Sequence, residues 1–364
     1  MSTASPISSS RSPRVSVLLP VHNGARFVAE AIESILVQTF EDFELIIIDD
    51  ASTDETPAIL ARLASRDARA RVITNETNLR QAGSLNRGLG LARSAYVAIH
   101  DADDRSFPTR LAKQVAFLDD HPEYDLVGTH SYVIDEDGSP AAPRVLVTDP
   151  ARLEAELLNK RNWVTHGSVM LRAASELVYR DKFLTSMDYE ALLRMMSAGR
   201  KLTNLPDCLY QYRFSRSQIT SERKLEQSFF AKRALHFHQQ RAATGRDDYE
   251  QWDHLAELAD YQRALGHRPA LLDAEFNYRR GLLYQLFTNG VYGPALKHAA
   301  FLLAHYAPWR LGLRWSALLP LVILKSSLML LLGRSRPAGF DWPEPKVDDN
   351  QPASGSGAQP PSEM

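Results

Sequence analysis

The stretch Val15-Ser-Val-Leu-Leu19, which continues into Pro20-Val-His-Asn-Gly24, indicates a short strand followed by a turn. A run of β-branched and leucine side chains bounded by Pro and Gly is typical of a buried strand. A second run, Phe43-Glu-Leu-Ile-Ile-Ile48, ends on two aspartates, and helical spacing over residues 26–37 separates the two runs. This order of strand, helix and strand predicts neighbouring parallel strands.

The alternation continues along the chain, with predicted strands at 71–74 and 95–99 and predicted helices at 52–64 and 83–93. We therefore predict an α/β fold with a mostly parallel, helix-flanked sheet. In such sheets ligands bind outside the carboxyl ends of the strands. Here those ends carry a concentration of polar residues: Pro20 to Asn23, Asp49, Asp50 and Asp101 to Asp104.

Asp101, Asp103 and Asp104 place three carboxylates within four residues. Like charges this close repel one another unless a cation or solvent screens them. Mg²⁺ and Mn²⁺ prefer oxygen ligands, and Mg²⁺ commonly uses one or two carboxylates together with phosphate oxygens. Because the cluster follows a buried strand, we interpret it as a metal site. The alternative is a solvated acidic turn in which Asp104 caps the helix near Pro108.

Two further strand ends offer groups for a nucleotide. Asp49 and Asp50 follow an apolar strand, and a carboxylate there can accept a hydrogen bond from a base N–H or a ribose hydroxyl. The alternative is a loop pair that caps backbone amides. Arg80 precedes a predicted helix and can reach a phosphate, or it can be solvated.

Taken in order, these motifs resemble the family 2 inverting glycosyltransferases, which have the GT-A fold. The similarity covers about residues 14–215. Each motif is modest alone, but the ordered set is specific. The set is Pro20-Val-His-Asn-Gly24, Gln38-Thr-Phe40, Ile48-Asp-Asp-Ala-Ser-Thr-Asp-Glu-Thr56, residues 78–88 and Asp101-Ala-Asp-Asp104.

The resemblance implies a metal-dependent, inverting, hexosyltransferase-like enzyme. It would move a sugar from a UDP or dTDP donor to a saccharide or lipid-linked saccharide, in the synthesis of cell-surface polysaccharide. Asp101 and Asp103 would hold Mn²⁺ or Mg²⁺ with the donor diphosphate, and Asp104 would support them. Asp50 would bind the uracil or thymine base, and Asp49 would support that loop. The other donor-binding residues implied are Pro20, His22, Asn23, Arg80 and Ala102.

For catalysis the resemblance implies a carboxylate base that precedes a helix. Asp188 in Met187-Asp-Tyr-Glu-Ala-Leu-Leu-Arg194 fits that register, and an inverting transfer needs such a base opposite the leaving diphosphate. Glu190 is the competing candidate for the base. The alternative interpretation of Asp188 is an ordinary helix N-cap without a catalytic role. His166, in His166-Gly-Ser-Val-Met170, would lie on the acceptor side or serve only structure.

The chain departs from the family pattern at two places. Met187 replaces the usual acidic partner of the base, and Ser215 stands where many relatives have a His that completes the metal shell or touches the diphosphate. Arg213 or Arg216 would have to substitute electrostatically for that His. These departures leave a second hypothesis open, namely a catalytically weakened protein that binds nucleotide sugars.

The domain organisation follows from composition. We predict a disordered leader at 1–13, a GT-A domain at 14–220, a helical accessory or membrane-associating region at 221–335, and a disordered Pro- and Ser-rich tail at 336–364. Within the GT-A domain, residues 163–171 are predicted to form a further strand.

The most apolar stretch, residues 315–332, is interrupted by Pro320 and Lys325 and flanked by arginines on both sides. An interfacial helix that gives peripheral membrane contact through 310–336 explains the basic flanks. A buried helix and a membrane-spanning helix are the alternatives, and a central Lys disfavours the last.

The global composition excludes some classes of function. The net charge is −2 and the pI is about 6.6, so no basic surface for nucleic acid is indicated. A single cysteine is compatible with a reducing compartment, and we expect a cytoplasmic protein at the cytoplasmic face of the inner membrane. Nucleotidyl transfer is disfavoured because residues 14–24 lack a basic, glycine-rich loop, and no Cys/His spacing indicates zinc.

Overall fold

A computed structural model describes residues 12–175, 177–215, 223–264, 274–288, 291–305 and 308–331. The predicted leader, apart from residues 12 and 13, and the predicted tail lie outside these ranges. The described chain contains one sheet with the strand order β3-β2-β1-β4-β8-β6-β9-β5, and β7 pairs with β6. Its strands are β1 (Val15–Val21), β2 (Phe43–Asp49), β3 (Ala70–Thr74), β4 (Tyr96–Ile99), β5 (Arg105–Ser106), β6 (Leu126–Ile134), β7 (Pro140–Arg144), β8 (Met170–Arg172) and β9 (Leu202–Arg213).

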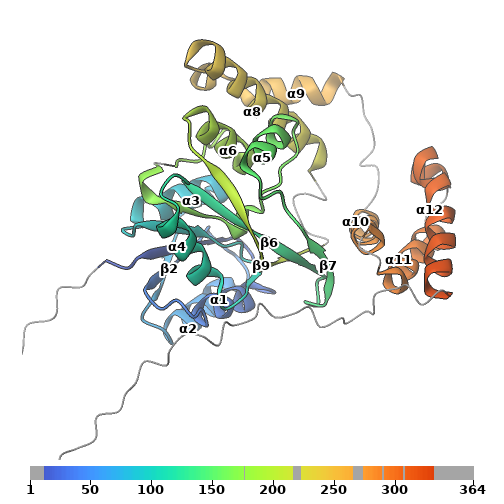
Figure 1. The fold of residues 1–364 in the computed structure, drawn as a ribbon, viewed down its shortest axis with the longest axis horizontal. Helices are drawn as coiled ribbons and strands as arrows, with labels where there is room; N and C mark the ends of the chain where they lie inside the picture. The colour runs from blue at the N-terminus through green and yellow to red at the C-terminus, as the bar shows by residue number, and fades with distance from the viewer. Residues whose placement is uncertain are drawn as a thin grey trace, which may run out of the picture.

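The first four strands form the parallel half of the sheet that the sequence predicts. β1 pairs in parallel with β2 and β4, and β2 pairs in parallel with β3. The helices α1 (Val28–Leu36), α2 (Thr56–Ala64) and α3 (Arg80–Leu91) connect these strands. The predicted α/β fold of GT-A type is thereby confirmed, and the helical C-terminal region that should follow it is present (Figure 1).

The two faces of the sheet are covered by separate apolar cores. Along β1, Val17 and Leu19 belong to one core and Leu18 to the other, as the two-residue period of a strand requires. The helix α3 packs closely on the sheet at Gly88, because a Cβ there would lie 3.2 Å from Leu18 and 3.1 Å from Ile48. All of these apolar side chains are fully buried. Because they are closely packed, they hold the ends of β1 and β2 in place.

The second half of the sheet is mixed. β8 pairs antiparallel with both β4 and β6, whereas β6 and β9 pair in parallel. The prediction of one strand over residues 163–171 was wrong, because His166–Ser168 form a 3₁₀ turn and only β8 is extended. Side chains of α4 (Arg110–Asp120) satisfy the carbonyls there: Gln114 Nε2 donates to Ser168 O at 2.8 Å, and Arg110 donates to Val169 O at 3.2 Å.

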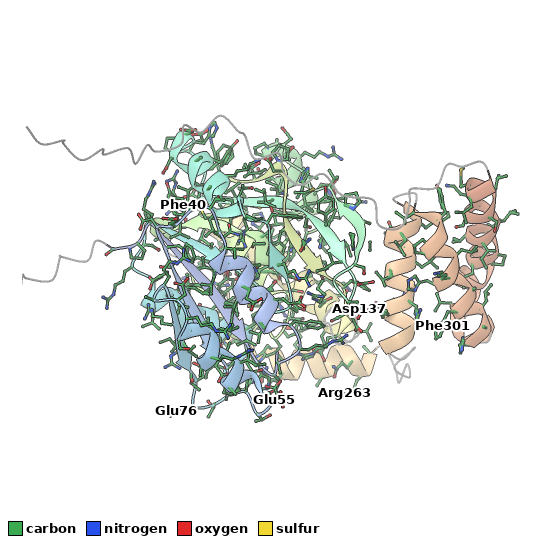
Figure 2. All side chains as sticks on the ribbon, turned by 90° about the horizontal axis from the view of Figure 1, so that it is seen from below. Phe40, Glu55, Glu76, Asp137, Arg263 and Phe301 are labelled. Carbon is green, nitrogen blue, oxygen red and sulfur yellow. The ribbon has the colours of Figure 1, made fainter. Side chains whose placement is uncertain are left out.

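The remaining helices lie around the antiparallel half and beyond it. α5 (Pro150–Leu158) and α6 (Met187–Ser197) lie near α8 (Lys224–Thr244) and α9 (His254–Ala264) (Figure 1). The last three helices are α10 (Ala274–Thr288), α11 (Tyr292–His305) and α12 (Pro308–Leu331), and they stand beside the body that holds the sheet (Figure 2). Among the helices of the described ranges, none is both long and apolar enough to cross a membrane.

Candidate functional site

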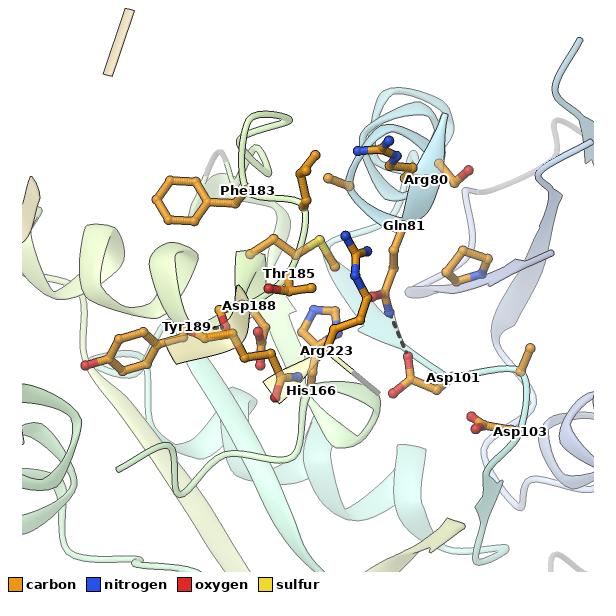
Figure 3. A pocket seen from close by; sticks show the side chains of 18 of the residues that line it. Arg80, Gln81, Asp101, Asp103, His166, Phe183, Thr185, Asp188, Tyr189 and Arg223 are labelled. Carbon is orange, nitrogen blue, oxygen red and sulfur yellow. Dashed lines mark hydrogen bonds between the residues drawn. The ribbon is translucent and has the colours of Figure 1, made fainter. Parts of the chain in front are cut away.

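A cleft of about 1160 Å³ opens at the carboxyl ends of β1, β2 and β4 and extends to the first turn of α6. Most of the residues predicted for the site line this cleft. They are Pro20, His22, Asn23, Asp50, Arg80, Asp101, Ala102, Asp103, His166 and Asp188. Figure 3 shows Asp101 and Asp103 on one side, Asp188 on the other, and His166 between them.

The half of the cleft that the sequence predicts to bind the donor is built on the loops after β1 and β2. His22 Nδ1 lies 2.8 Å from the Asp50 carbonyl oxygen, and Asn23, with φ at +51°, accepts from Thr53 N at 2.8 Å. Asp50 is buried, and its Oδ1 accepts from Asn75 Nδ2 and from the backbone N–H of Leu79, both at 2.7 Å. The two loops are therefore tied together before any ligand enters.

Asp49 does not line the cleft. It is buried, and its Oδ1 accepts from the backbone N–H of Ser52 at 3.1 Å, while its carbonyl accepts from Asn75 N at 2.8 Å. Asp49 fits the loop-capping alternative that the sequence left open for the pair, whereas Asp50 accepts from the Leu79 amide and also lines the cleft. Asp49 thus shapes the turn that presents Asp50.

The loop after β4 carries two carboxylates that face the cleft. Asp101 Oδ1 accepts from Gln81 Nε2 at 3.2 Å, and the backbone N–H of Asp101 donates to the Tyr210 hydroxyl at 3.2 Å. Burial raises the pKa of Asp101. The charge of His166 acts to lower this pKa, and the charge of Asp188 raises it further. Burial and the charge of Asp101 raise the pKa of Asp103 to about 7. Both carboxylates would therefore gain from a cation in the cleft.

Asp104 faces the protein and anchors the loop. It is buried, its Oδ1 accepts from the backbone N–H of Arg213 at 2.7 Å, and the cap position of α4 is Thr109, so the alternative in which Asp104 caps that helix is wrong. The Arg213 side chain donates to the Asp103 carbonyl oxygen and to Glu30 Oε2, both at 2.6 Å. Arg213 is thus committed to holding the loop and is not available to replace the missing histidine at a diphosphate. Arg216 lies outside the described residues.

A buried arginine lies beneath the carboxylates. Arg110 is fully buried, donates to the Ile99 carbonyl at 2.7 Å, and stacks 5.2 Å from the ring centroid of Tyr210. Burial lowers the pKa of its guanidinium to about 10, and the charges of Asp101 and Asp104 oppose that effect. It therefore remains a cation at neutral pH and partly balances the acidic loop.

The opposite wall of the cleft carries Asp188. The cap position of α6 is Ser186, with φ at +56°, so the interpretation of Asp188 as a helix N-cap is wrong. Asp188 lies in the first turn, where the helix dipole favours a carboxylate, and its Oδ2 accepts from Asn162 Nδ2 at 3.0 Å. Asn162 is itself fixed, because its Oδ1 accepts from Val164 N at 3.0 Å.

A histidine stands between the two acidic groups (Figure 3) and contacts a buried tyrosine. His166 Nε2 lies 2.8 Å from the hydroxyl of Tyr179, and Asn86 of α3 pairs with both the N–H and the C=O of Tyr179, at 2.7 Å and 2.8 Å. Burial, then the charges of Asp188 and Asp101, raise the pKa of the tyrosine hydroxyl. It therefore stays protonated and serves as a hydrogen-bond donor or acceptor.

Glu190 is not brought to the cleft. Its carboxylate is fully buried and pairs with Arg194 at 3.2 Å, Arg180 at 3.4 Å and Arg241 at 3.8 Å. Arg241 belongs to α8, so this cluster fastens α6 to the C-terminal region. A carboxylate so paired cannot approach an acceptor hydroxyl, and Asp188 is left as the carboxylate of α6 that faces the cleft.

The residues present can supply part of a metal shell. In the described ranges no group of three or more His, Cys, Asp or Glu side chains is placed to surround an ion. Asp101 and Asp103 are two oxygen donors with raised pKa values beside open space. This donor set fits Mg²⁺ or Mn²⁺, provided that substrate phosphates complete the shell.

Sequence reasoning missed the residues that position the named ones: Gln81, Asn86, Arg110, Asn162, Gly167, Tyr179 and Tyr210. A Cβ on Gly167 would lie 2.1 Å from the Tyr210 hydroxyl and 2.6 Å from Asp101 Oδ2, so only glycine fits there. The glycine directly after His166 was the one local signal for this contact. The others act across large sequence separations and leave no such trace.

Comparison with known proteins identifies the family. The family model for glycosyl transferase family 2 matches residues 16–176. A putative glycosyltransferase of Bacillus subtilis, EpsE, is 42% identical over 207 residues, which is 55% of this chain and 73% of EpsE. A putative teichuronic acid biosynthesis glycosyltransferase of the same organism, TuaG, is 28% identical over 218 residues, 58% of this chain and 83% of TuaG.

A solved structure shares the fold. The crystal structure of S. aureus TarS 1–349 in complex with UDP-GlcNAc superposes with a TM-score of 0.51 and 16% identity, covering 88% of this chain and 92% of that one. At this identity the likeness concerns the fold alone. The sequence relatives decide the family: the chain belongs to glycosyl transferase family 2.

Proposed function

We propose that this family 2 glycosyltransferase is a metal-dependent, inverting enzyme that transfers a sugar, of hexosyl type, from a UDP or dTDP donor. The observation that carries the proposal is the placement of Asp101 and Asp103 across one cleft from Asp188. A cation-binding pair and a separate carboxylate on the facing wall are the two groups that such a transfer needs.

Mn²⁺ or Mg²⁺ would be held by Asp101 and Asp103, and when bound it supplies charge that stabilises the departing diphosphate. Gln81 orients one of these carboxylates through the 3.2 Å hydrogen bond to Asp101 Oδ1. Arg213 and Asp104 fix the backbone of the loop from behind. Arg80, at the start of α3, lines the cleft and would bind a donor phosphate oxygen.

Asp50 would recognise the base. Its Oδ1 is engaged by Asn75 and Leu79, which fixes the plane of the carboxylate. Its Oδ2 can then accept the imide N–H of uracil or thymine. Pro20, His22 and Asn23 line the same part of the cleft and would enclose the nucleoside.

Asp188 would act as the general base. An acceptor hydroxyl held between Asp188 and the donor sugar attacks the anomeric carbon, its proton passes to the Asp188 carboxylate, and the bond from that carbon to the diphosphate oxygen breaks. Attack from the face opposite the diphosphate inverts the configuration. Asn162 orients the carboxylate, and His166 with Tyr179 would position the acceptor.

The acceptor proposed is a saccharide or lipid-linked saccharide of a cell-surface polysaccharide. TuaG, whose name assigns it to teichuronic acid biosynthesis, supports this choice of pathway class. We further propose that the protein works at the cytoplasmic face of the membrane, with peripheral contact through residues 310–336. Residues 332–336 of that range lie outside the described structure.

The test measures donor binding and turnover separately. A thermal-shift panel of nucleotide sugars, with and without Mn²⁺, identifies the donor, and release of its nucleotide measures turnover. We expect Asp188→Asn to lower turnover by about 10²–10⁴-fold with donor binding retained, and Asp103→Ala to abolish the effect of Mn²⁺. Asp137→Asn, at a carboxylate that is 87% exposed, is the matched control. Near-normal turnover in Asp188→Asn would refute the assignment, and metal-independent binding without turnover in the wild type would favour a nucleotide-sugar-binding protein.

A further inference from the structure

The charges of the chain are divided unevenly along its length. Between Glu275 and Asp341 there is no acidic residue, although the whole chain has 44. The same stretch contains eight basic residues: Arg279, Arg280, Lys297, Arg310, Arg314, Lys325, Arg334 and Arg336. The near-neutral net charge of −2 therefore combines a segment of +8 with a remainder of −10, of which −4 belongs to residues 341–364.

This acid-free segment contains nearly all of α10 and the whole of α11 and α12, which together we name the basic module. Lys297 of α11 and Lys325 of α12 are exposed, and Arg279 stacks 4.2 Å from the ring centroid of Phe301. Because the segment has no carboxylate of its own, its positive charge is not balanced from within. A partner with a dense negative charge would complement it.

α12 also carries an exposed ridge of leucines, Leu321, Leu324 and Leu328, with exposed fractions of 60%, 67% and 49%. Their spacing puts them on one face of the helix. Leu319, Val322 and Ser326 each lie two positions before a leucine of the ridge, and all three are buried. Leu319 and Val322 belong to the apolar core that α12 shares with the other two helices. Two residues correspond to about 200° around a helix, so the ridge points away from the packed side.

The basic module is packed firmly on the sheet. Phe214, directly after β9, stacks on Tyr278 of α10 with ring centroids 6.0 Å apart. A Cβ on Gly281 of α10 would lie 2.2 Å from the same phenylalanine ring, so the helix approaches as closely as glycine permits. Because Arg213 precedes Phe214 and holds the Asp103 loop, the module is joined to the strand that supports the cleft.

We propose that the basic module is a docking surface for an anionic phospholipid bilayer, with the leucine ridge inserted among the lipids and the basic residues at the headgroups. This proposal rests on the peripheral contact proposed for residues 310–336, and it adds which helices, which apolar side chains and which lipid charge make that contact. Amphipathic helices with basic residues and an apolar face bind membranes in this way. A second copy of the chain fits poorly, because a self-complementary contact would bring two positively charged modules together. A nucleic acid would match the charge but would leave the leucines in water.

The test is sedimentation of the full chain with vesicles of phosphatidylcholine alone or mixed with phosphatidylglycerol. We expect binding to the mixed vesicles only, and weaker binding in high salt because exposed charges are screened. The triple variant Leu321→Gln, Leu324→Gln, Leu328→Gln should bind at least about tenfold more weakly, since it removes the inserted apolar surface. Lys297→Glu with Lys325→Glu tests the charge without touching the ridge. Leu255→Gln, at a leucine of α9 that is 58% exposed, is the control and should bind as the wild type does.

Donor hydrolysis in solution should be unchanged in all of these variants, which separates this proposal from the transfer chemistry. The inference is overturned if the triple variant and the Leu255→Gln control bind vesicles equally, or if pure phosphatidylcholine binds as well as the mixture. It is also overturned if the wild type is a dimer that the ridge variant dissociates, or if a phosphate-rich polynucleotide binds independently of the ridge.

Discussion

Replacing Gly167 with alanine tests whether the packing beneath Asp101 sets the activity. Gly167 is not among the glycines with positive φ, so alanine can adopt its backbone and only the added methyl group matters. That carbon would lie 2.1 Å from the Tyr210 hydroxyl and 2.6 Å from Asp101 Oδ2, where ordinary contacts begin near 3.4 Å. Something must therefore move by about 1 Å.

Two groups should move: the 3₁₀ turn that carries position 167, which must draw back from the Tyr210 hydroxyl, and the Asp101 carboxylate, which the added methyl group would also meet. Tyr210 is fully buried under Arg110, and its hydroxyl accepts from the Asp101 backbone, so its ring has no space to retreat. The Asp101 carboxylate borders the open cleft and can be displaced into it. A misplacement of about 1 Å at a reacting site can lower the rate about 10²-fold, so we expect a loss of that order in kcat/KM for Gly167→Ala.

The assay is metal-dependent release of nucleotide from the donor that the thermal-shift panel identifies. Gly90→Ala is the matched control, because a Cβ there meets nothing within 4 Å and lies on α3, where alanine favours the helix. Circular dichroism and thermal unfolding establish that both variants are folded. If folded Gly167→Ala kept within about threefold of the wild-type rate, a 1 Å displacement would not matter there, and the role given to Asp101 would be wrong.

Three further outcomes are expected. Asn162→Ala should lower kcat about tenfold with the donor KM unchanged, because a freed Asp188 carboxylate loses its orientation but still reaches the acceptor; steady-state kinetics measure this. Asn86→Ala removes two hydrogen bonds to the backbone of Tyr179 and should lower the free energy of unfolding by about 1–3 kcal/mol, measured in urea. Asp119→Asn should make the free energy of unfolding depend less on pH in the acid range. Burial raises the pKa of Asp119, but hydrogen bonds from a tyrosine and an arginine lower it overall. The stability that Asp119 contributes is therefore present above the ordinary aspartate pKa and is lost as the pH falls through the native pKa.

Each outcome has a contrary result. A rise in the donor KM of Asn162→Ala with unchanged kcat would assign that residue to donor binding. Unfolding of Asn86→Ala at the wild-type urea concentration would mean that water replaces the two hydrogen bonds without cost. An acid unfolding curve that Asp119→Asn leaves unmoved would show that the aspartate has the same pKa in both states.

The parallel half of the fold could be predicted because its signals are local. The runs at 15–19 and 43–48 are apolar on both faces, which is what a strand covered by helices on each side needs. The polar residues that follow each run mark the carboxyl ends, which explains why the predicted residues at the ends of β1, β2 and β4 line the cleft, apart from Asp49.

The supporting contacts could not be predicted, because they join residues that are far apart in the chain. Nothing near Arg213 reveals that its backbone will meet Asp104, 109 residues away. The 3₁₀ turn at His166–Ser168 was also hidden, since Gln114 and Arg110, more than 50 residues earlier, satisfy carbonyls that a strand would have paired. Glu190 was misplaced partly for the same reason: Arg194 lies one turn away on α6, but Arg241 comes from α8, about 50 residues later.

The contact between Asn86 and Tyr179 has a consequence for protein engineering. Asn86 bonds to the main-chain N–H and C=O of position 179, not to its side chain, as one strand would bond to another. Any residue other than proline could offer the same pair of groups. A grafted segment from a relative would therefore receive the same pair of backbone hydrogen bonds at position 179, as long as the amide at position 86 is kept. Chimaeras joined on either side of this contact should fold with their two halves aligned.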